Sequence, residues 1–262
     1  MDTYRALKVN KPPRAKQSCA FDVVEWARVR LGFQADERQA EVLRSGAKWG
    51  ILNCTRQWGK STLGAAKVVH HACANAGSLV LVASPSGRQS GELMHKAAAM
   101  LARLGIRKRG APGATDISLM LPNGSRIVGL PGIEATARGF SAVSLLVIDE
   151  AARVEDAAYK TLRPMLATVN GGVWLLSTPF GKRGFFWEEW AHGGEDWFRM
   201  SVPATECTRI SREWLEKERR SMGPTWFQQE YMCAFLDNGA AVFGRDLVEA
   251  AFDEGVEELR LG

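Results

Sequence analysis

The sequence predicts an α/β protein with a mostly parallel sheet flanked by helices. Short apolar runs at residues 49–54, 78–83, 145–150 and 173–178 carry this prediction, because each is too short for a typical helix. Helical patterns lie between these runs, as expected for parallel strands joined by crossover helices. Ligands of such folds bind at the carboxyl ends of the strands, so the polar residues there are candidate site residues.

The first run leads into Thr55-Arg-Gln-Trp-Gly-Lys-Ser61 and then into a helical pattern, the context that a phosphate-binding loop requires. The first N–H groups and the dipole of that helix would face an anion, with Lys60 reaching the β- and γ-phosphates and Ser61 ligating Mg²⁺. The strict pattern G-x-x-x-x-G-K-[ST] fails, because its first glycine would fall at Cys54. Gly-Lys-Ser also occurs by chance, but Arg56 is a residue that a phosphate site can use.

The third run ends in Asp149-Glu150, which places two acids at the carboxyl end of a buried strand. Asp149 would hold Mg²⁺, directly or through water, and Glu150 would polarise the water that attacks the γ-phosphate. The alternative is that both acids only cap the helix that follows. The two signals occur together, in the expected order, and so indicate an ATPase or GTPase.

Composition favours a soluble protein of one domain, or of one domain with a small appendage, at 262 residues. The five cysteines form no C-x-x-C pair, so we expect neither zinc nor a disulfide framework, and a reducing cytoplasm fits. The net charge of +5 favours a polyanionic partner. No apolar run approaches the roughly 18 residues of a membrane span, and the first residues lack the apolar core of a signal peptide.

The first third is expected to begin with a flexible basic arm at 1–20, which either contacts DNA or a partner protein or is merely solvated. Helical spacing follows at 21–31 and 36–43, with Asp36 as N-cap. Gln39 precedes the loop strand, where a glutamine amide could read the adenine edge. An exposed helical glutamine is the alternative.

The middle of the chain predicts helices over about 61–76 and 84–105. The basic cluster at 107–109 is either a DNA-facing surface or a solvated loop. Residues 117–130 predict a β-hairpin with Asn123-Gly124 at its turn, an antiparallel insertion beside the parallel sheet.

Arg138 falls in a loop before the acidic strand, where it could act as an arginine finger on a neighbouring subunit's nucleotide or be a surface arginine. A helix is expected at about 155–168, followed by a strand at 173–181. If this strand lies between the loop strand and the acidic strand, Ser177 and Thr178 would lie near the γ-phosphate and could sense hydrolysis.

The last third predicts a helical segment from 210 to 235, broken at Gly223-Pro224, whose final residues would close over the nucleotide as a lid. This part is rich in tryptophan, and we expect most of these side chains to be packing residues, with stacking on nucleic-acid bases as the minority interpretation. The tryptophans concerned are Trp187, Trp190, Trp197, Trp214 and Trp226.

Residues 35–236 resemble the ATPase domain of the large terminase subunit of tailed bacteriophages, the motor that pumps DNA into a prohead. The loop is similar to that family's variant phosphate loop, in which an arginine replaces the glycine-rich spacing. Further matching features are the acidic strand 145–150, the coupling motif Ser177-Thr178-Pro179, Gln39 on the adenine side, and the lid-end segment 227–231.

This resemblance implies a RecA-like P-loop fold of the ASCE class, with the Ser177 strand between the loop and acidic strands. It implies a P-loop ATPase core at 21–202 and a lid subdomain at 203–236. Residues 237–262 would be a linker or the start of a nuclease domain that the sequence otherwise lacks, so we expect ATP hydrolysis without DNA cleavage.

The resemblance also implies Mg²⁺-dependent ATP hydrolysis that drives translocation of double-stranded DNA. Arg56 and Glu150 would act within the subunit, and Arg138 would act across a subunit interface. The nucleotide would be bound by Gln39 and by Thr55, Arg56, Gln57, Trp58, Gly59, Lys60, Ser61 and Thr62, and Mg²⁺ by Ser61 and Asp149.

Family members work in the host cytoplasm as homo-oligomeric rings on the portal protein, with a small terminase subunit that selects DNA; the isolated chain could be a monomer. A helicase-like DNA-dependent ATPase is the nearest rival, but it needs a second RecA-like domain, and about 80 residues after the coupling strand are too few. A non-hydrolysing nucleic-acid-binding or assembly module is the other rival. Intact Lys60, Ser61, Asp149 and Glu150 argue against it.

Overall fold

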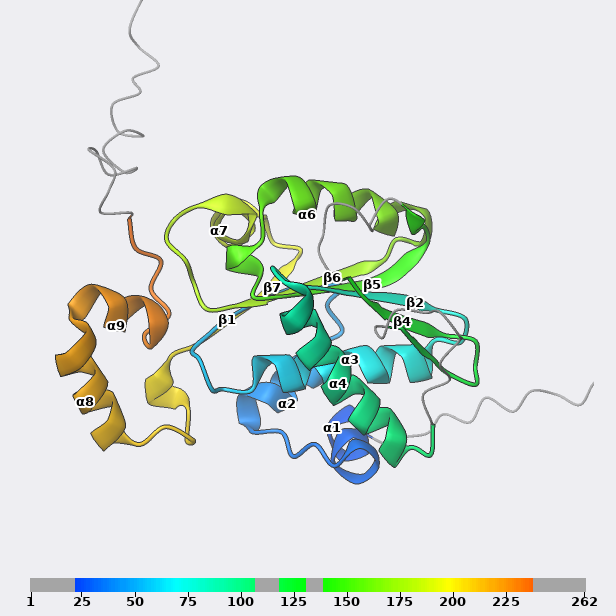
Figure 1. The fold of residues 1–262 in the computed structure, drawn as a ribbon, viewed down its shortest axis with the longest axis horizontal. Coiled ribbons are helices and arrows are strands. Elements are labelled where there is room, and N and C mark those ends of the chain that lie inside the picture. Colours follow the sequence, from blue (N-terminus) through cyan, green and yellow to red (C-terminus); the bar gives the residue numbers. More distant parts are fainter. Residues whose placement is uncertain (1–21, 107–117, 131–138, 238–262) are drawn as a thin grey trace, which may run out of the picture.

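A computed structural model describes residues 22–106, 118–130 and 139–237 of the chain. A seven-stranded sheet in the order β3-β4-β2-β5-β6-β1-β7 forms its centre (Figure 1). Every pairing is parallel except that between β3 and β4, which confirms the predicted fold class. The strands are β1 Trp49–Cys54, β2 Leu79–Ala83, β3 Ser118–Met120, β4 Arg126–Gly129, β5 Val143–Asp149, β6 Gly172–Ser177 and β7 Trp197–Val202.

Strand β6 lies between β1 and β5, as predicted for the strand that ends in Ser177. Asn53 of β1 is opposite Ser177, and Asp149 of β5 is opposite Leu176. The three strands therefore end at one edge of the sheet. The loop that follows β1, the two acids and the hydroxyls of Ser177 and Thr178 meet there because the strands are parallel and in register.

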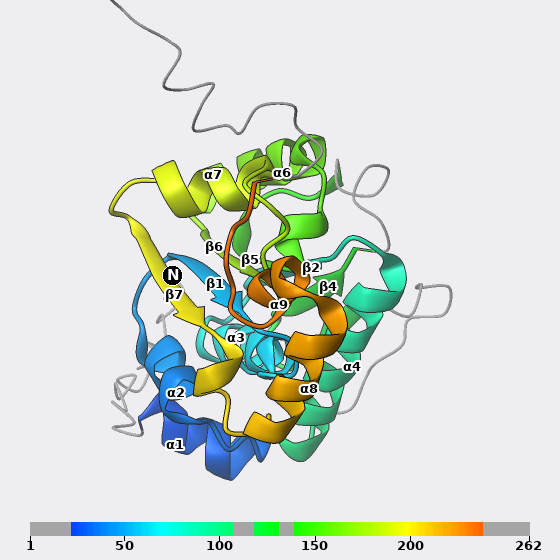
Figure 2. The ribbon, with the colours of Figure 1, turned by 90° about the vertical axis from the view of Figure 1, so that its left-hand side faces the viewer.

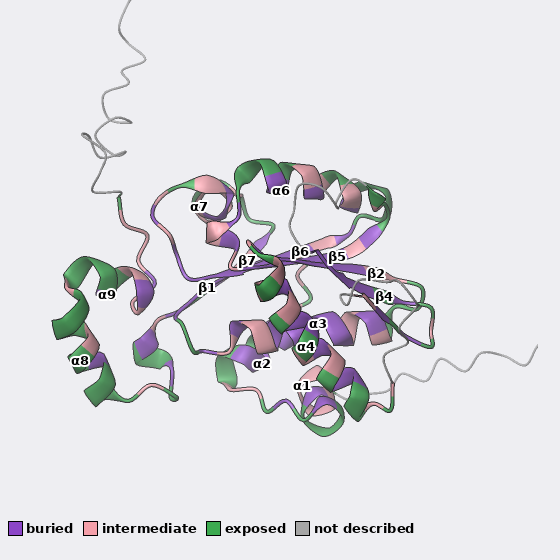
Figure 3. Ribbon diagram, in the orientation of Figure 1, coloured by how far each residue is buried: buried purple, intermediate pink, exposed green. Residues whose placement is uncertain are grey.

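Helices cover both faces of the sheet (Figures 1 and 3). One face carries α1 Val23–Trp26, a π-helical turn Ala27–Leu31, α2 Glu37–Arg44, α3 Lys60–Ala74 and α4 Gly87–Arg103. The other carries 3-10 turns at Ala151–Arg153 and Arg163–Val169, with α6 Asp156–Leu162 and α7 Gly184–His192. Alternate strand residues bury toward the two layers: Leu52 and Cys54 face the first, and Ile51 faces the second.

Beyond β7 the chain forms a 3-10 turn Ala204–Glu206, α8 Arg212–Met222 and α9 Pro224–Glu230. Figure 2 shows α8 and α9 in front of the edge where β1 ends and α3 begins. A small apolar cluster around Leu215 and Phe227 holds them together. The predicted helical segment 210–235 is shorter than expected, since α9 ends at Glu230.

The hairpin forms, but it is part of the main sheet rather than an insertion beside it. Strand β4 pairs in parallel with β2, and only β3 at the edge is antiparallel. Gly124 takes the left-handed conformation (φ 83°) that the turn requires. The Asn123 side-chain amide donates to the Ala72 carbonyl at 2.8 Å, which ties the turn to the end of α3.

Several local predictions are confirmed and others are wrong. Asp36 caps α2, and its Oδ1 accepts from the Gln39 N–H at 2.9 Å. The helix expected at 155–168 ends at Leu162 and continues as a 3-10 turn that contains Pro164, a residue without an N–H to donate. Strand β7 and helix α7 were not predicted. Trp214 of α8 and Trp226 of α9 are about half exposed rather than packed.

Within the described residues, no helix has the length and apolar character needed to cross a membrane.

Lys67 of α3 lines a cavity of about 460 Å³ at the opposite edge of the sheet, where β5 and β6 begin. Its ammonium group lies 3.8 Å from the centre of the Trp174 ring and 3.5 Å from the Val42 carbonyl oxygen. Burial lowers the pKa of Lys67 to about 8, from an ordinary value of 10.5. The charged form of this side chain is therefore destabilised by folding.

We expect Lys67→Met to raise the free energy of unfolding by about 3 kcal/mol at pH 7, because each pH unit between the two pKa values costs about 1.4 kcal/mol. Below pH 8 both states hold the proton, so the folded wild type bears the full cost. Between pH 8 and 10.5 the folded state releases the proton while the unfolded state keeps it, so the wild type gains stability and the difference shrinks. Urea unfolding of both proteins at pH 7 and pH 10 measures this.

Lys48→Met is the matched control, since Lys48 lines the same cavity but is exposed. Its urea unfolding measures the effect of removing an exposed lysine from this cavity, against which the Lys67→Met result is compared. A constant difference between Lys67→Met and wild type over this pH range would contradict the assignment.

Candidate active site

The loop after β1 forms a turn without the first glycine of the strict motif. Cys54, at that position, is the last residue of β1 and is fully buried, so no special backbone conformation is required there. The chain turns later, through Gln57 (φ 65°) and Gly59 (φ 95°), both left-handed. Gly59 is the N-cap of α3, and its carbonyl accepts from the N–H groups of Thr62 and Leu63.

Lys60 is the first residue of α3 and is almost fully buried. Its ammonium group donates to the carbonyls of Cys54 and Thr55, each at 3.2 Å, and therefore lies over the loop. The helix dipole and the first N–H groups of α3 point to the same place. These features together form an anion-binding site.

Asp149 ends β5 and is 4% exposed. Burial raises the pKa of its carboxyl, while a hydrogen bond with Ser61 and the charge of Lys60 act in the opposite direction. The structure thus brings the two predicted magnesium ligands, Ser61 and Asp149, into contact. The Ser61 contact joins the start of α3 to the end of β5.

Glu150 adopts a left-handed conformation (φ 52°, ψ 42°), which is uncommon for a residue other than glycine. Such strain is found preferentially at functional sites. Its N–H donates to Asp149 Oδ1 at 3.1 Å. Its side chain makes no capping hydrogen bond to the 3-10 turn that follows, so the interpretation of these acids as helix caps is wrong for Glu150.

The residues around Asp149 suit Mg²⁺, which prefers oxygen ligands, keeps several waters and is often shared with substrate phosphates. Asp149 and Ser61 offer a carboxylate and a hydroxyl. The Ser84 hydroxyl is buried without a hydrogen-bond partner. Ser84 follows Ala83, which is opposite Ile148, so it lies beside Asp149. In the described part of the chain no group of three or more His, Cys, Asp and Glu could hold a metal alone.

A pocket of about 400 Å³ opens where these elements meet. Its positive side chains outnumber its one carboxylate, that of Glu150, so the pocket suits a polyanion such as a nucleoside triphosphate. The cavity that Lys67 lines is slightly larger, but none of the predicted site residues lines it. The pocket is lined by Arg56, Gln57, Gly59, Lys60, Ser61, Thr62, Gln89, Lys96, Glu150 and Arg153.

Arg56 connects the loop to α9. Its Nε donates to Glu230 Oε2 at 2.6 Å, and its side chain is 61% exposed whereas that of Glu230 is 7% exposed. The Thr55 hydroxyl donates to the Glu230 carbonyl at 3.1 Å. The end of α9 is therefore fixed to the loop by two contacts, and Arg56 lies at the rim of the pocket.

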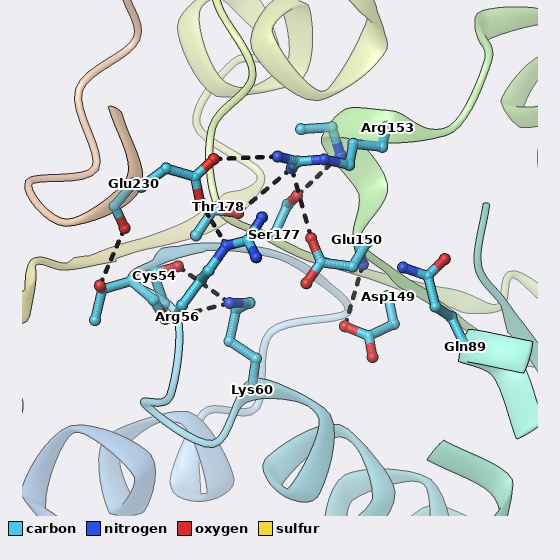
Figure 4. A network of polar contacts seen from close by, with 12 residues as sticks. Cys54, Arg56, Lys60, Gln89, Asp149, Glu150, Arg153, Ser177, Thr178 and Glu230 are labelled. Carbon is cyan, nitrogen blue, oxygen red and sulfur yellow. Dashed lines mark hydrogen bonds and ion pairs between the residues drawn. The ribbon is translucent and has the colours of Figure 1, made fainter. Parts of the chain in front are cut away.

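Figure 4 shows a second arginine, Arg153, on the 3-10 turn after β5. It donates to the Thr178 hydroxyl at 3.5 Å and to Glu230 Oε1 at 3.2 Å, and it lies 3.7 Å from Glu150 Oε2. The Ser177 hydroxyl accepts from the Ala152 N–H at 3.1 Å. The hydroxyls of Ser177 and Thr178 therefore both contact the turn that follows the two acids.

Gln39 is fully buried, so the interpretation as an exposed helical glutamine is wrong. Its Nε2 donates to the Trp58 carbonyl at 2.9 Å, and its Oε1 accepts from the Asp36 N–H at 3.1 Å. Arg209 also donates to the Trp58 carbonyl. The Trp58 side chain is buried in the core, so only its backbone is available to a ligand.

Four residues of this site were not predicted. Lys96 and Gln89 are seven positions apart on α4, and this spacing alone would have placed them on one helix face. Arg153 follows the two acids closely, and Glu230 lies within the segment 227–231. Nothing in the sequence near either residue indicates that the two side chains pair with each other. Arg138, the basic arm at 1–20 and the basic cluster at 107–109 lie outside the described residues.

Comparisons with known proteins give matches to one family and one fold. A family model described as the N-terminal part of the T4likevirus-type terminase large subunit matches residues 51–250. Among solved structures, the large terminase ATPase domain of Thermus phage P74-26 is 21% identical, with a TM-score of 0.63 over 80% of this chain and 97% of that chain. A search of curated proteins gives no significant match.

Two further structures share the fold at lower identity. The large terminase of a second thermophilic bacteriophage, in complex with ATP-gamma-S, is 13% identical, with a TM-score of 0.60 over 82% of this chain and 51% of that chain. The present chain thus covers about half of that terminase. Dbp5 of S. cerevisiae, bound to RNA and ADP BeF3, is 13% identical, with a TM-score of 0.52 over 71% of this chain and 51% of that chain.

Proposed function

From the premise that the chain belongs to the large terminase subunits of the T4-like-virus type, we propose that it couples Mg-ATP hydrolysis to translocation of double-stranded DNA. The chain contains the N-terminal ATPase domain of that family. The observation that carries the proposal is the meeting of Lys60 and Glu150 in one pocket, next to the contact between Ser61 and Asp149. Lys60 and Ser61 follow β1, and Asp149 and Glu150 lie at the end of β5, so the proposed cation, base and metal ligands come from two parallel strands.

In this proposal the triphosphate lies at the start of α3. Lys60 leaves the carbonyls of Cys54 and Thr55 to contact the β- and γ-phosphates, and the N–H groups of the loop residues 57–62 donate to phosphate oxygens. Ser61 and Asp149 would hold Mg²⁺, which would supply positive charge to the phosphates. Gln39 acts on the adenine side only through the loop, because its side chain is fully buried and donates to the Trp58 carbonyl.

Glu150 orients the attacking water and accepts its proton while the oxygen bonds to the γ-phosphorus, and the bond to the ADP oxygen breaks. Arg56 contributes positive charge to the phosphates from within the subunit, and Arg138 does so from a neighbouring subunit. Ser177 and Thr178 relay the loss of the γ-phosphate, because they contact the turn that carries Arg153.

The remaining assignments follow the family. Residues 21–202 form the ATPase core, 203–236 the lid, and 237–262 a linker or the first part of a nuclease domain. The partners are double-stranded DNA, a portal protein and a small terminase subunit. The chain acts as a homo-oligomeric ring in the host cytoplasm.

Calorimetry with Mg-ATP, followed by measurement of phosphate release with and without double-stranded DNA, tests this proposal. We expect binding of Mg-ATP and hydrolysis that double-stranded DNA stimulates, without separation of DNA strands. Strand separation would favour the helicase-like alternative. Failure to bind Mg-ATP would favour the non-hydrolysing assembly module. Binding is the deciding measurement, because a trans arginine is supplied only after ring assembly.

A further inference from the structure

Arg153 contacts three groups that belong to different parts of the site. Within one guanidinium, Nη2 donates to Glu230 Oε1 at 3.2 Å, and Nη1 lies 3.5 Å from the Thr178 hydroxyl and 3.7 Å from Glu150 Oε2 (Figure 4). The first group is on α9, the second follows β6 and the third follows β5. Arg153 therefore contacts all three groups with one side chain.

The two oxygens of the Glu230 carboxylate are held by different arginines. Arg56 donates to Oε2 and Arg153 donates to Oε1. Because the Glu230 side chain is almost fully buried, loss of either arginine leaves a buried carboxylate oxygen with fewer donors. The planar fork of an arginine can serve several acceptors at fixed angles, whereas a lysine cannot.

The backbone holds Arg153 in a fixed relation to Glu150. The Arg153 N–H donates to the Glu150 carbonyl at 2.9 Å, and the neighbouring Ala152 N–H donates to the Ser177 hydroxyl at 3.1 Å. The guanidinium also lies over the Phe180 ring, 4.7 Å from its centre. A displacement of Glu230 with α9 therefore acts on a side chain that is rigidly connected to Glu150.

We propose that Arg153 is a positioning residue that orients the Glu150 carboxylate and couples that orientation to the lid through Glu230. The inference rests on the proposed role of Glu150 in ATP hydrolysis. In this role Arg153 affects catalysis through its contacts with the Glu150 and Glu230 carboxylates and does not itself bind the phosphates. A direct phosphate ligand at this position would behave differently in the measurements below.

Hydrogen exchange on the full chain tests the connection to the lid without any need for activity. Arg153→Gln is expected to raise the exchange of the α9 amides about 10-fold, while amides of the central strands β5 and β6 keep their protection. Glu230→Gln is expected to raise this exchange at least as much, because it also weakens the contact with Arg56, and the double variant is expected to match Glu230→Gln alone. Arg153→Lys should stay closer to Arg153→Gln than to wild type.

Steady-state kinetics test the connection to Glu150. Arg153→Gln is expected to lower kcat about 10-fold with KM for ATP nearly unchanged, and to cause no further loss in a Glu150→Gln background. Arg183→Gln is the matched control. Arg183 lies 4.1 Å from the centre of the same Phe180 ring but outside this network, and its replacement should change neither measurement.

Unchanged α9 exchange in Arg153→Gln would overturn the coupling to the lid. A raised KM, or a loss in kcat that adds to that of Glu150→Gln, would make Arg153 a phosphate ligand instead. These outcomes are distinct from failure of the proposed function. In that case wild type and Glu150→Gln would be equally inactive. The hydrogen-exchange measurement would still show whether Arg153 stabilises α9 through Glu230.

Discussion

Glu150→Gln is expected to lower kcat for ATP hydrolysis by about 10²–10⁴-fold, the usual contribution of general base catalysis. The amide cannot accept the proton of the attacking water but keeps the size of the carboxylate. The affinity for Mg-ATP should change little, because Asp149 and Ser61 remain to hold the metal and Lys60 remains to hold the phosphates. Calorimetry with an ATP analogue and phosphate-release assays measure the two effects separately.

Glu155→Gln is the matched control for this experiment. Glu155 lies five residues further along the chain, is exposed and makes no capping hydrogen bond with its side chain. Its replacement should leave both binding and hydrolysis unchanged. If Glu150→Gln hydrolysed ATP at the wild-type rate, the base would have to be another group, and the left-handed conformation of Glu150 would be without a catalytic reason.

Lys60→Ala is expected to weaken both binding and hydrolysis. A charge-assisted hydrogen bond is worth about 1.5–3 kcal/mol, so Kd for Mg-ATP should rise by roughly 10- to 100-fold. The γ-phosphate also loses a cation that stabilises charge during transfer, so kcat should fall as well. Calorimetry and phosphate release are again the measurements.

The change also removes the donor to the carbonyls of Cys54 and Thr55. Thermal unfolding must therefore accompany the binding measurement, to separate a lost ligand contact from a disturbed loop. Lys67→Met provides the control on the same helix, since Lys67 lies at the opposite edge of the sheet and should leave nucleotide affinity unchanged. Wild-type affinity in Lys60→Ala would show that the nucleotide binds elsewhere.

The sequence predicted the main features of the fold because they depend on local patterns. Runs of buried residues at 145–150 and 173–178 determine strands, and the short spacing of Gly59, Lys60 and Ser61 determines the loop and the start of a helix. The position of β6 between β1 and β5 was implied by the family resemblance, and the structure confirms it. The hairpin was predicted from its turn, but its pairing with β2 was not, because pairing depends on contacts distant in sequence.

The sequence by itself thus predicted that a cation after one strand and two acids at the end of another lie at the same edge of the sheet. Only the tertiary structure decided what surrounds them. Arg56 and Glu230 are 174 positions apart and Arg153 and Glu230 are 77 apart, so no local spacing predicts these pairs. Burial decided the rest, because Gln39 and Trp58 have polar or aromatic side chains that suit a ligand site, but packing directs them into the protein. The interactions of a charged or amide side chain depend on which distant residues the fold places beside it, and the local sequence does not specify those residues.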